Sequence, residues 1–367
     1  MRRILLAVLI LGCAALVAGL VAGQQQAPKQ MTMEVSIVAT ANNAPVEDLK
    51  LEDVSVKDNN KKQEIVSFEK VVAGAPATPG KPGLYNIVML DCLNTTYRDL
   101  PENRLEILKI VNELSKAGNL TLIMLRSGPL RVVDDPGMQP PTLLRRFAAQ
   151  GGQGLEGAKP ALDAYDWVFS EQLGLYQLFT PAGVFDRRRI EDSMGALRTI
   201  AMNYQPRSGR KNLIWISQGF PITIGQNPVG YDAAALGQTT PTPSRSDDLA
   251  AYAKDMIYTS QMLMNSNVSV YPVDGRYLSV TDTVMSDQGN MQALAKETGG
   301  VAYLSRRDVA AALHEALNDT RTTYVLKYAM SNLKFDGSSH SIKVDTTRKN
   351  VKLRYRNGFF APSQAPK

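Results

Sequence analysis

Three segments of the chain differ in the pattern of their hydrophobic and polar positions. Residues 31–70 contain short runs in which the two kinds alternate, as at 33–39, and this period of two predicts half-buried β-strands. Residues 84–317 switch between unbroken apolar runs and stretches with apolar residues at helical spacing, which predicts buried parallel strands joined by amphipathic helices. Residues 322–360 return to short β-type runs. The patterns therefore predict a β segment, an α/β segment and a second β segment.

The limits of each pattern predict the domains and elements. We expect an α/β domain with a mainly parallel sheet at 83–318 and β segments at 24–82 and 319–363, with a linker at 74–82. Because chain termini often lie close together, the two β segments are expected to form one small sandwich. The expected strands are 33–39, 53–56, 63–68, 84–91, 120–125, 130–133, 212–217, 268–273, 301–304, 322–329, 339–346 and 351–360, and the expected helices are 101–114, 143–148, 190–204, 247–264, 291–297 and 308–317.

The first 23 residues have the pattern of a secretory signal peptide. Arg2 and Arg3 precede an apolar run over 4–21, and Ala22 and Gly23 supply the small residues of a cleavage site. We expect cleavage after Gly23 and a mature protein that is secreted or periplasmic, with no membrane span left. The alternative is an uncleaved N-terminal anchor, because the apolar run is about long enough to cross a bilayer.

The composition argues against one class of partner. The chain has 367 residues, of which 44% are hydrophobic and 21% charged, as in folded soluble proteins. The signal holds two of the 41 basic residues and no acidic residue, so the mature chain has 39 basic and 35 acidic residues, a net charge of +4. Because this bias is small and no basic stripe is interleaved with aromatic residues, we expect no binding to nucleic acid.

The cysteines exclude an internal disulfide in the mature chain. Removing the signal removes Cys13 and leaves Cys92. A single cysteine has no partner within the chain, although an exported compartment would permit a disulfide. Cys92 is either a reactive thiol beside a binding site or a small buried hydrophobic residue at the end of a strand.

Small polar side chains follow three of the expected parallel strands at the points where the strands end. A carboxylate ends the strand at 84–91, and an amide and a hydroxyl come soon after it. A hydroxyl and a second carboxylate end two later strands. Ligands of open α/β sheets bind just outside the carboxyl ends of the strands. The predicted binding residues are Asp91, Asn94, Thr95, Ser217 and Asp274.

Several motifs of the chain resemble von Willebrand factor A domains. The chain is similar in particular to the secreted "VWFA-related" proteins of acidobacteria, whose leading β segment and tail resemble residues 46–68 and 354–360. The resemblance spans about residues 31–362 and implies a Rossmann-like A domain with a mainly parallel central sheet. The motifs that carry it are Asp91-Cys-Leu-Asn-Thr, Gly209-Arg-Lys-Asn-Leu-Ile-Trp-Ile-Ser-Gln-Gly-Phe-Pro, Val270-Tyr-Pro-Val-Asp, Thr298-Gly-Gly-Val-Ala-Tyr and Tyr324-Val-Leu-Lys-Tyr.

The resemblance implies a degenerate metal-ion-dependent adhesion site. In such domains an Asp-x-Ser-x-Ser motif, a threonine and a second aspartate hold Mg²⁺ or Ca²⁺, which then binds an acidic group of the partner. Asp91 and Thr95 match two of these positions and Asn94 offers an amide oxygen, so these three residues are the implied ligands. Leu93 replaces the first serine, and the second aspartate is missing, with Ser217-Gln-Gly in its place. The alternative is a vestigial pocket in which Asp91 caps backbone N–H groups.

We expect the chain to act by binding and not by catalysis. The segment over 221–246 is too long for a plain connection and leaves the same sheet edge, which favours a module that recognises a protein or cell-surface ligand. A hydrolase using Ser217 is the enzymatic alternative, but Ser217 lacks the first glycine of a nucleophile elbow. The two histidines, His314 and His340, fall in an expected helix and a terminal strand. The third possibility is an envelope scaffold that needs no metal.

Overall fold

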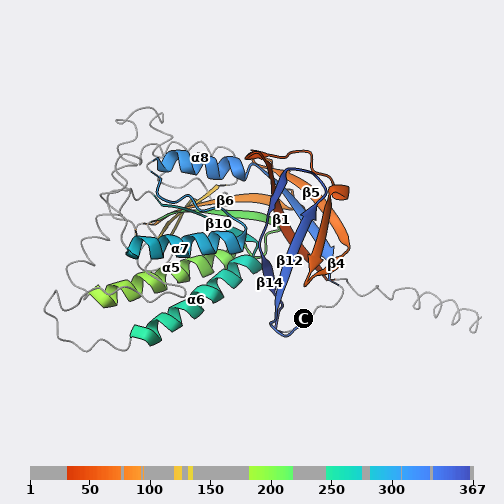
Figure 1. The fold of residues 1–367 in the computed structure, drawn as a ribbon. Coiled ribbons are helices and arrows are strands. Elements are labelled where there is room, and N and C mark those ends of the chain that lie inside the picture. The colour runs from red at the N-terminus through yellow and green to blue at the C-terminus, as the bar shows by residue number, and fades with distance from the viewer. Residues whose placement is uncertain are drawn as a thin grey trace, which may run out of the picture.

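The described chain forms two parts that lie side by side (Figure 1): a five-stranded sheet with helices, called here the parallel-sheet part, and a curled antiparallel β body. The expected signal at 1–23, the expected helices at 101–114 and 143–148, residues 221–244 of the segment over 221–246, Cys92 and Thr95 all lie outside the described residues. The computed structural model describes residues 31–75, 78–91, 94, 120–125, 131–134, 182–217, 245–274, 282–306, 308–330 and 334–363.

The parallel-sheet part is built on strands in the order β10-β9-β6-β7-β8. Three of the four neighbouring pairs are parallel, and β8 runs antiparallel to β7. Helices cover the sheet, and all eight residues of β9 are buried, including the polar Arg210, Lys211 and Asn212 near its start. The strands are β6 (Gly83–Asp91), β7 (Leu120–Leu125), β8 (Arg131–Asp134), β9 (Gly209–Ile216) and β10 (Val268–Val273).

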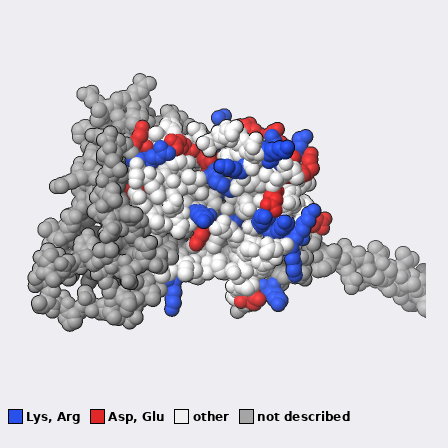
Figure 2. Space-filling view, in the orientation of Figure 1, with Lys and Arg blue, Asp and Glu red and all other residues white. Residues whose placement is uncertain are grey.

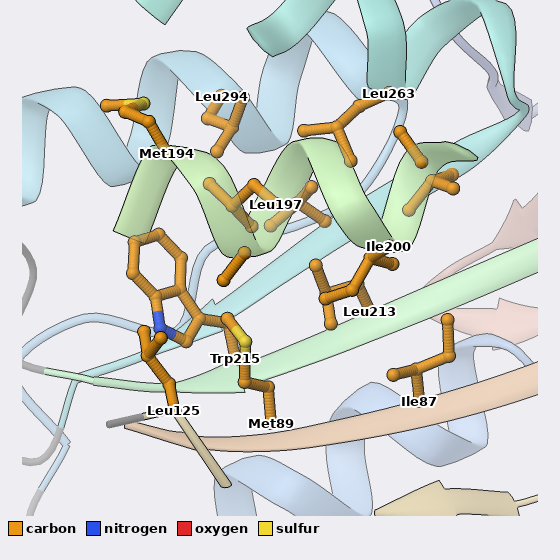
Figure 3. Close-up of a cluster of buried hydrophobic side chains, with 14 of the residues drawn as sticks. Ile87, Met89, Leu125, Met194, Leu197, Ile200, Leu213, Trp215, Leu263 and Leu294 are labelled. Carbon is orange, nitrogen blue, oxygen red and sulfur yellow. The ribbon is translucent and has the colours of Figure 1, made fainter. Parts of the chain in front are cut away.

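Helices pack on both faces of this sheet. Figure 1 shows α5 (Ala182–Tyr204), α6 (Arg245–Asn265) and α7 (Asp282–Thr298) on one face and α8 (Val309–Asp319) on the other. α8 begins where the Asp308 carboxylate accepts the Ala311 N–H at 2.8 Å. The core under α5 joins side chains of three helices to the strands (Figure 3), among them Met89, Leu125, Met194, Leu197, Ile200, Leu213, Trp215, Leu263 and Leu294.

The β body combines strands from both ends of the described chain. Its sheets have the orders β13-β1-β11-β5 and β14-β12-β3-β4, and all their pairs are antiparallel. They enclose a core that includes Ile37, Val56, Tyr324 and Phe359. The strands are β1 (Thr32–Ala41), β2 (Ala44–Pro45), β3 (Val54–Asp58), β4 (Lys61–Gln63), β5 (Ile65–Val72), β11 (Thr322–Ala329), β12 (Ser339–Thr346), β13 (Val351–Arg354) and β14 (Gly358–Phe360).

The predicted fold class is wrong. The described chain is not an α/β fold with a mainly parallel, Rossmann-like core, because two of its three sheets are antiparallel and the only described sheet with parallel pairs has five strands. The expected edge strand at 301–304 is reduced to a single bridge between Tyr303 and Val273. The physical reason is that the strands of the two terminal segments curl around a hydrophobic core of their own, and these strands make up the two antiparallel sheets.

β1 differs from the half-buried strand that its alternating pattern predicts. Residues 35–39 are all buried, so both faces of the strand are covered. Val35 and Ile37 point into the core of the β body. The polar face, with Glu34 and Ser36, lies against the parallel-sheet part, where its side chains bind polar groups. Polar residues in a strand therefore mark an interface here and not a solvent-exposed face.

The carboxylate of Glu34 joins the β body to the amino ends of the parallel strands. It accepts the Gly209 N–H at 2.6 Å and the Ser208 hydroxyl at 2.5 Å. Gly209 has φ +102°, and a Cβ there would lie 2.0 Å from the carbonyl oxygen of Gly83, so only glycine fits this close approach. We call this region the joint; it comprises Glu34, Ser208, Gly209, Arg210, Lys211 and Arg356.

Three cationic side chains are buried in the joint. Arg210, Lys211 and Arg356 are 0%, 2% and 3% exposed. Burial lowers the pKa of Lys211 to about 8 and that of Arg356 to about 10. Burial raises the pKa of Glu34, but its hydrogen bonds and the nearby lysine charges outweigh this and hold the pKa below its usual value. The joint is thus rich in positive charge, and Glu34 is the carboxylate that offsets it.

Replacing Glu34 should weaken the whole fold. We expect Glu34→Ala to lower the free energy of unfolding by about 3 kcal/mol, because a buried N–H and a buried lysine lose their acceptor and counter-charge. The control is Glu47→Ala, whose side chain is 61% exposed in an ion pair with Lys70 and should cost below about 1 kcal/mol. Urea unfolding measures both, and equal losses would contradict the role given to Glu34.

Lys211 should make stability rise with pH. Its pKa is about 8 in the folded protein, against an ordinary value of 10.5, so between these pH values the unfolded chain binds more protons. The free energy of unfolding should therefore increase from pH 8 to pH 10, by at most about 3 kcal/mol. Lys211→Met should flatten this rise. Urea unfolding of both proteins at several pH values tests it, and parallel curves would show that Lys211 carries no such proton linkage.

Candidate functional site

The polar strand ends lie at the edge of the parallel sheet opposite the joint. Asp91 ends β6, while Ser217 and Asp274 directly follow β9 and β10. Because β9 lies between β6 and β10, three adjoining strands carry these residues to one edge. The Ser217 N–H extends the pairing with β10 by donating to the carbonyl oxygen of Val273 at 3.0 Å.

Asp91 is the centre of a buried hydrogen-bond cluster, and it is 1% exposed. Its Oδ1 accepts the backbone N–H of Asn94 at 2.8 Å. Its Oδ2 accepts the Asn94 side-chain amide at 2.9 Å, the Trp215 indole N–H at 3.0 Å and the Ser217 hydroxyl at 2.5 Å. Burial raises the pKa of Asp91, although each of these hydrogen bonds favours the charged form.

Asn94 extends the cluster to helix α5. Its side-chain nitrogen donates to the hydroxyl of Ser193 at 2.8 Å as well as to Asp91. Ser193 is 0% exposed and Asn94 is 7% exposed. The segment after β6, the end of β9 and α5 are thereby connected through four side chains, which we call the Asp91 cluster: Asp91, Asn94, Ser193 and Ser217.

Asp274 belongs to a separate set of contacts. Its carboxylate accepts the amide of Gln288 on α7 at 3.1 Å, and the same amide donates to Ser305 at 2.9 Å. Its backbone N–H donates to the carbonyl oxygen of Tyr303, and its own carbonyl accepts the N–H of Arg306. Asp274 is 0% exposed. Among described residues, these bonds hold a turn next to β10 and do not reach Asp91.

The Asp91 cluster does not fit the divalent cation that the sequence resemblance implies. Mg²⁺ and Ca²⁺ need oxygen lone pairs, and the described contacts of the Asp91 carboxylate are all with hydrogen-bond donors. Asn94 turns its amide nitrogen toward Asp91, and nitrogen with two hydrogens is no ligand. Of the three implied ligands, Thr95 lies outside the described residues. The described residues also contain no group of three or more His, Cys, Asp or Glu that could hold a metal ion.

The enzymatic alternative needs a base near Ser217. The Ser217 hydroxyl donates to Asp91, a carboxylate that three further donors already engage. His340 lies in the β body, where it contacts Asp58 at 2.7 Å and stacks on Phe359 with ring centroids 4.5 Å apart. His314 lies on α8. The described histidines therefore do not contact Ser217.

Two members of the site carry no sequence signal that pattern reasoning uses. Ser193 is a polar residue within a helix, where it looks like one more solvent-facing position. Trp215 is a hydrophobic residue inside the strand expected at 212–217. The hydrophobic pattern of that strand does not predict a partner for the indole N–H. Only packing brings Trp215 to Asp91 and Ser193 to Asn94.

No family model matches the chain, and no curated protein matches it. Solved structures give weak similarities. The TFIIH p34 N-terminal domain has a TM-score of 0.34 at 8% identity, over 64% of this chain and 96% of that one. Human COPII-coat protein Sec24c has 0.33 at 10%, over 81% and 46%. The D319A mutant of the PilB minor pilin from Streptococcus sanguinis has 0.31 at 12%, over 81% and 79%. Likenesses this low support no argument about fold or function.

The outer surface gives two further observations. Figure 2 shows basic and acidic side chains intermixed over the β body on the face viewed. Within the described residues, no helix is both long and apolar enough to cross a membrane.

Removing the Asp91 carboxylate should destabilise the protein. We expect Asp91→Ala to lower the free energy of unfolding by about 3 kcal/mol, because buried N–H and O–H donors lose their acceptor. Asp336→Ala is the matched control: Asp336 also accepts a backbone N–H, from Ser338 at 2.9 Å, but in an exposed turn. Asp336→Ala should lower the free energy of unfolding by less than about 1 kcal/mol. Thermal and urea unfolding compare the two, and a similar loss in both would mean that the buried cluster adds no stability of its own.

Proposed function

We propose that this chain is an exported, non-enzymatic binding module that recognises a protein or cell-surface ligand at the carboxyl edge of its parallel sheet. The observation that supports this most is the placement of Asp91, Ser217 and Asp274 on three adjoining strands at one edge, opposite the joint. Hydrogen bonds hold this edge from below, so the surface above it is supported by a rigid base. Preorganised surfaces bind with less loss of entropy.

The sequence motifs support the same proposal. The resemblance to secreted proteins with von Willebrand factor A motifs points to adhesion or recognition, and the signal pattern at 1–23 points to export into the periplasm or beyond the cell. The β body packs at the opposite ends of these strands, so it does not cover the carboxyl edge. We propose no catalytic role, because Ser217 donates to Asp91 and touches no described histidine.

An envelope scaffold is the second candidate, and β5 favours it. β5 ends its sheet among the described strands, and Val66 and Val72 on it are 47% and 38% exposed. An apolar sheet edge can add a strand from another chain. Assembly through β5 would use the β body and leave the carboxyl edge unused.

Blocking one edge at a time tests the proposed function. Residues 24–367 are prepared with Cys92→Ser, and a single cysteine is introduced at Arg306 beside Asp274 or at Lys62 on β4, both exposed positions. Each is coupled to a polyethylene glycol maleimide, and saturable binding to isolated cell envelopes and to intact cells is measured. We expect the polymer at 306 to reduce affinity at least about tenfold, and the polymer at 62 to leave it unchanged.

The same proteins separate the two candidates. Loss of binding with the polymer at 62 but not at 306 would contradict the proposed function and favour a contact on the β body. Sedimentation of unlabelled protein and of Val66→Lys then shows whether that contact is self-assembly through β5. Binding that neither polymer affects would also contradict recognition at the carboxyl edge.

A further inference from the structure

The indole of Trp215 restricts what can bind at the Asp91 carboxylate. Its N–H donates to Oδ2 at 3.0 Å, and an indole nitrogen is a donor only. Trp215 is 0% exposed, and Figure 3 shows its ring packed between the sheet and α5. The N–H cannot turn away without disrupting the hydrophobic core. A cation on this oxygen would therefore lie against the positive end of a fixed dipole.

The side-chain amide of Asn94 bridges two oxygens of the Asp91 cluster. Its amide nitrogen lies 2.9 Å from Asp91 Oδ2 and 2.8 Å from Ser193 Oγ. The amide has two hydrogens, one for each acceptor, and it brings no net charge into a buried site. The Ser217 hydroxyl completes the connection to β9. Neutral donors thus hold the segment after β6, the end of β9 and α5 together.

We propose that Asn94 is the residue that positions this edge of the sheet and closes the Asp91 cluster to divalent cations. Recognition at the edge is then independent of Mg²⁺ and Ca²⁺, a consequence that rests on the proposed function. The closure itself is a property of the folded protein and can be measured without any ligand. The ligand of this chain therefore does not need the acidic group that a bound cation would coordinate.

Replacing the amide nitrogen of residue 94 with oxygen should allow the Asp91 cluster to bind divalent cations. Asn94→Asp replaces the bridging amide nitrogen with oxygen and places a second carboxylate beside Asp91. The hydroxyl of Ser193 lies beside residue 94 and that of Ser217 beside Asp91, so the variant presents the hard oxygen ligands that Mg²⁺ and Ca²⁺ prefer. Without a cation, two adjacent carboxylates cannot both ionise easily, and the cluster should loosen.

The experiment compares residues 24–367 with Asn94→Asp, with Asn94→Asp/Asp91→Asn and with Asn94→Ala. Titration calorimetry uses MgCl₂, CaCl₂ and MnCl₂, and thermal melting is recorded in EDTA and in each salt. We expect no saturable heat and an unchanged melting temperature for the unaltered chain. Asn94→Asp should melt lower in EDTA and recover in a divalent salt, whereas the double variant and Asn94→Ala should not recover.

Two results would overturn the inference. One is saturable cation binding to the unaltered chain that is lost in Asp91→Asn. The other is a folded Asn94→Asp variant whose melting temperature does not change when divalent salts are added. If that variant does not fold, Trp215 fluorescence in a Trp167→Phe background decides, since the chain has two tryptophans. Emission that stays constant with added cation supports closure, and a saturable shift contradicts it. None of these readouts uses the ligand, so the proposed function can fail separately.

Discussion

Buried polar groups need hydrogen-bond partners, and this constraint shapes both ends of the parallel sheet. At the amino ends, Glu34 accepts the Gly209 N–H where three cations are buried. At the carboxyl ends, Asp91 accepts four hydrogen bonds from three residues. β9 runs from one carboxylate to the other and is buried along its whole length. An unpaired group at either end would cost as much as several apolar contacts contribute.

The joint and the Asp91 cluster connect opposite ends of the parallel strands to different elements. The joint fixes the β body to the amino ends of the strands, with the buried Lys211 and Arg356 donating to backbone carbonyls. The Asp91 cluster fixes the opposite edge to α5 through Ser193. Hydrogen bonds thus connect the sheet to other elements at both ends of its strands.

Local patterns predicted the position of several elements well. The strands expected at 84–91, 268–273, 322–329 and 339–346 coincide with β6, β10, β11 and β12 to within one residue, because each is bounded by a clear polar or turn residue. Helix starts were predicted poorly: α5 begins at Ala182 and not at 190, and α7 at Asp282 and not at 291. In each helix a run without apolar residues, at 186–189 and at 286–290, separates the first apolar residues from the expected start.

The sequence alone determined most of the described strands and the polar residues at the ends of three of them, Asp91, Ser217 and Asp274. The tertiary structure decided the fold class, since sheet order and curl depend on pairings such as β1 with β11, nearly 300 residues apart in the chain. It also decided that Glu34 lies in the joint, that Ser193 contacts Asn94 and that Trp215 contacts Asp91. Periodicity reports how one segment faces solvent, whereas these contacts depend on which other segment covers it.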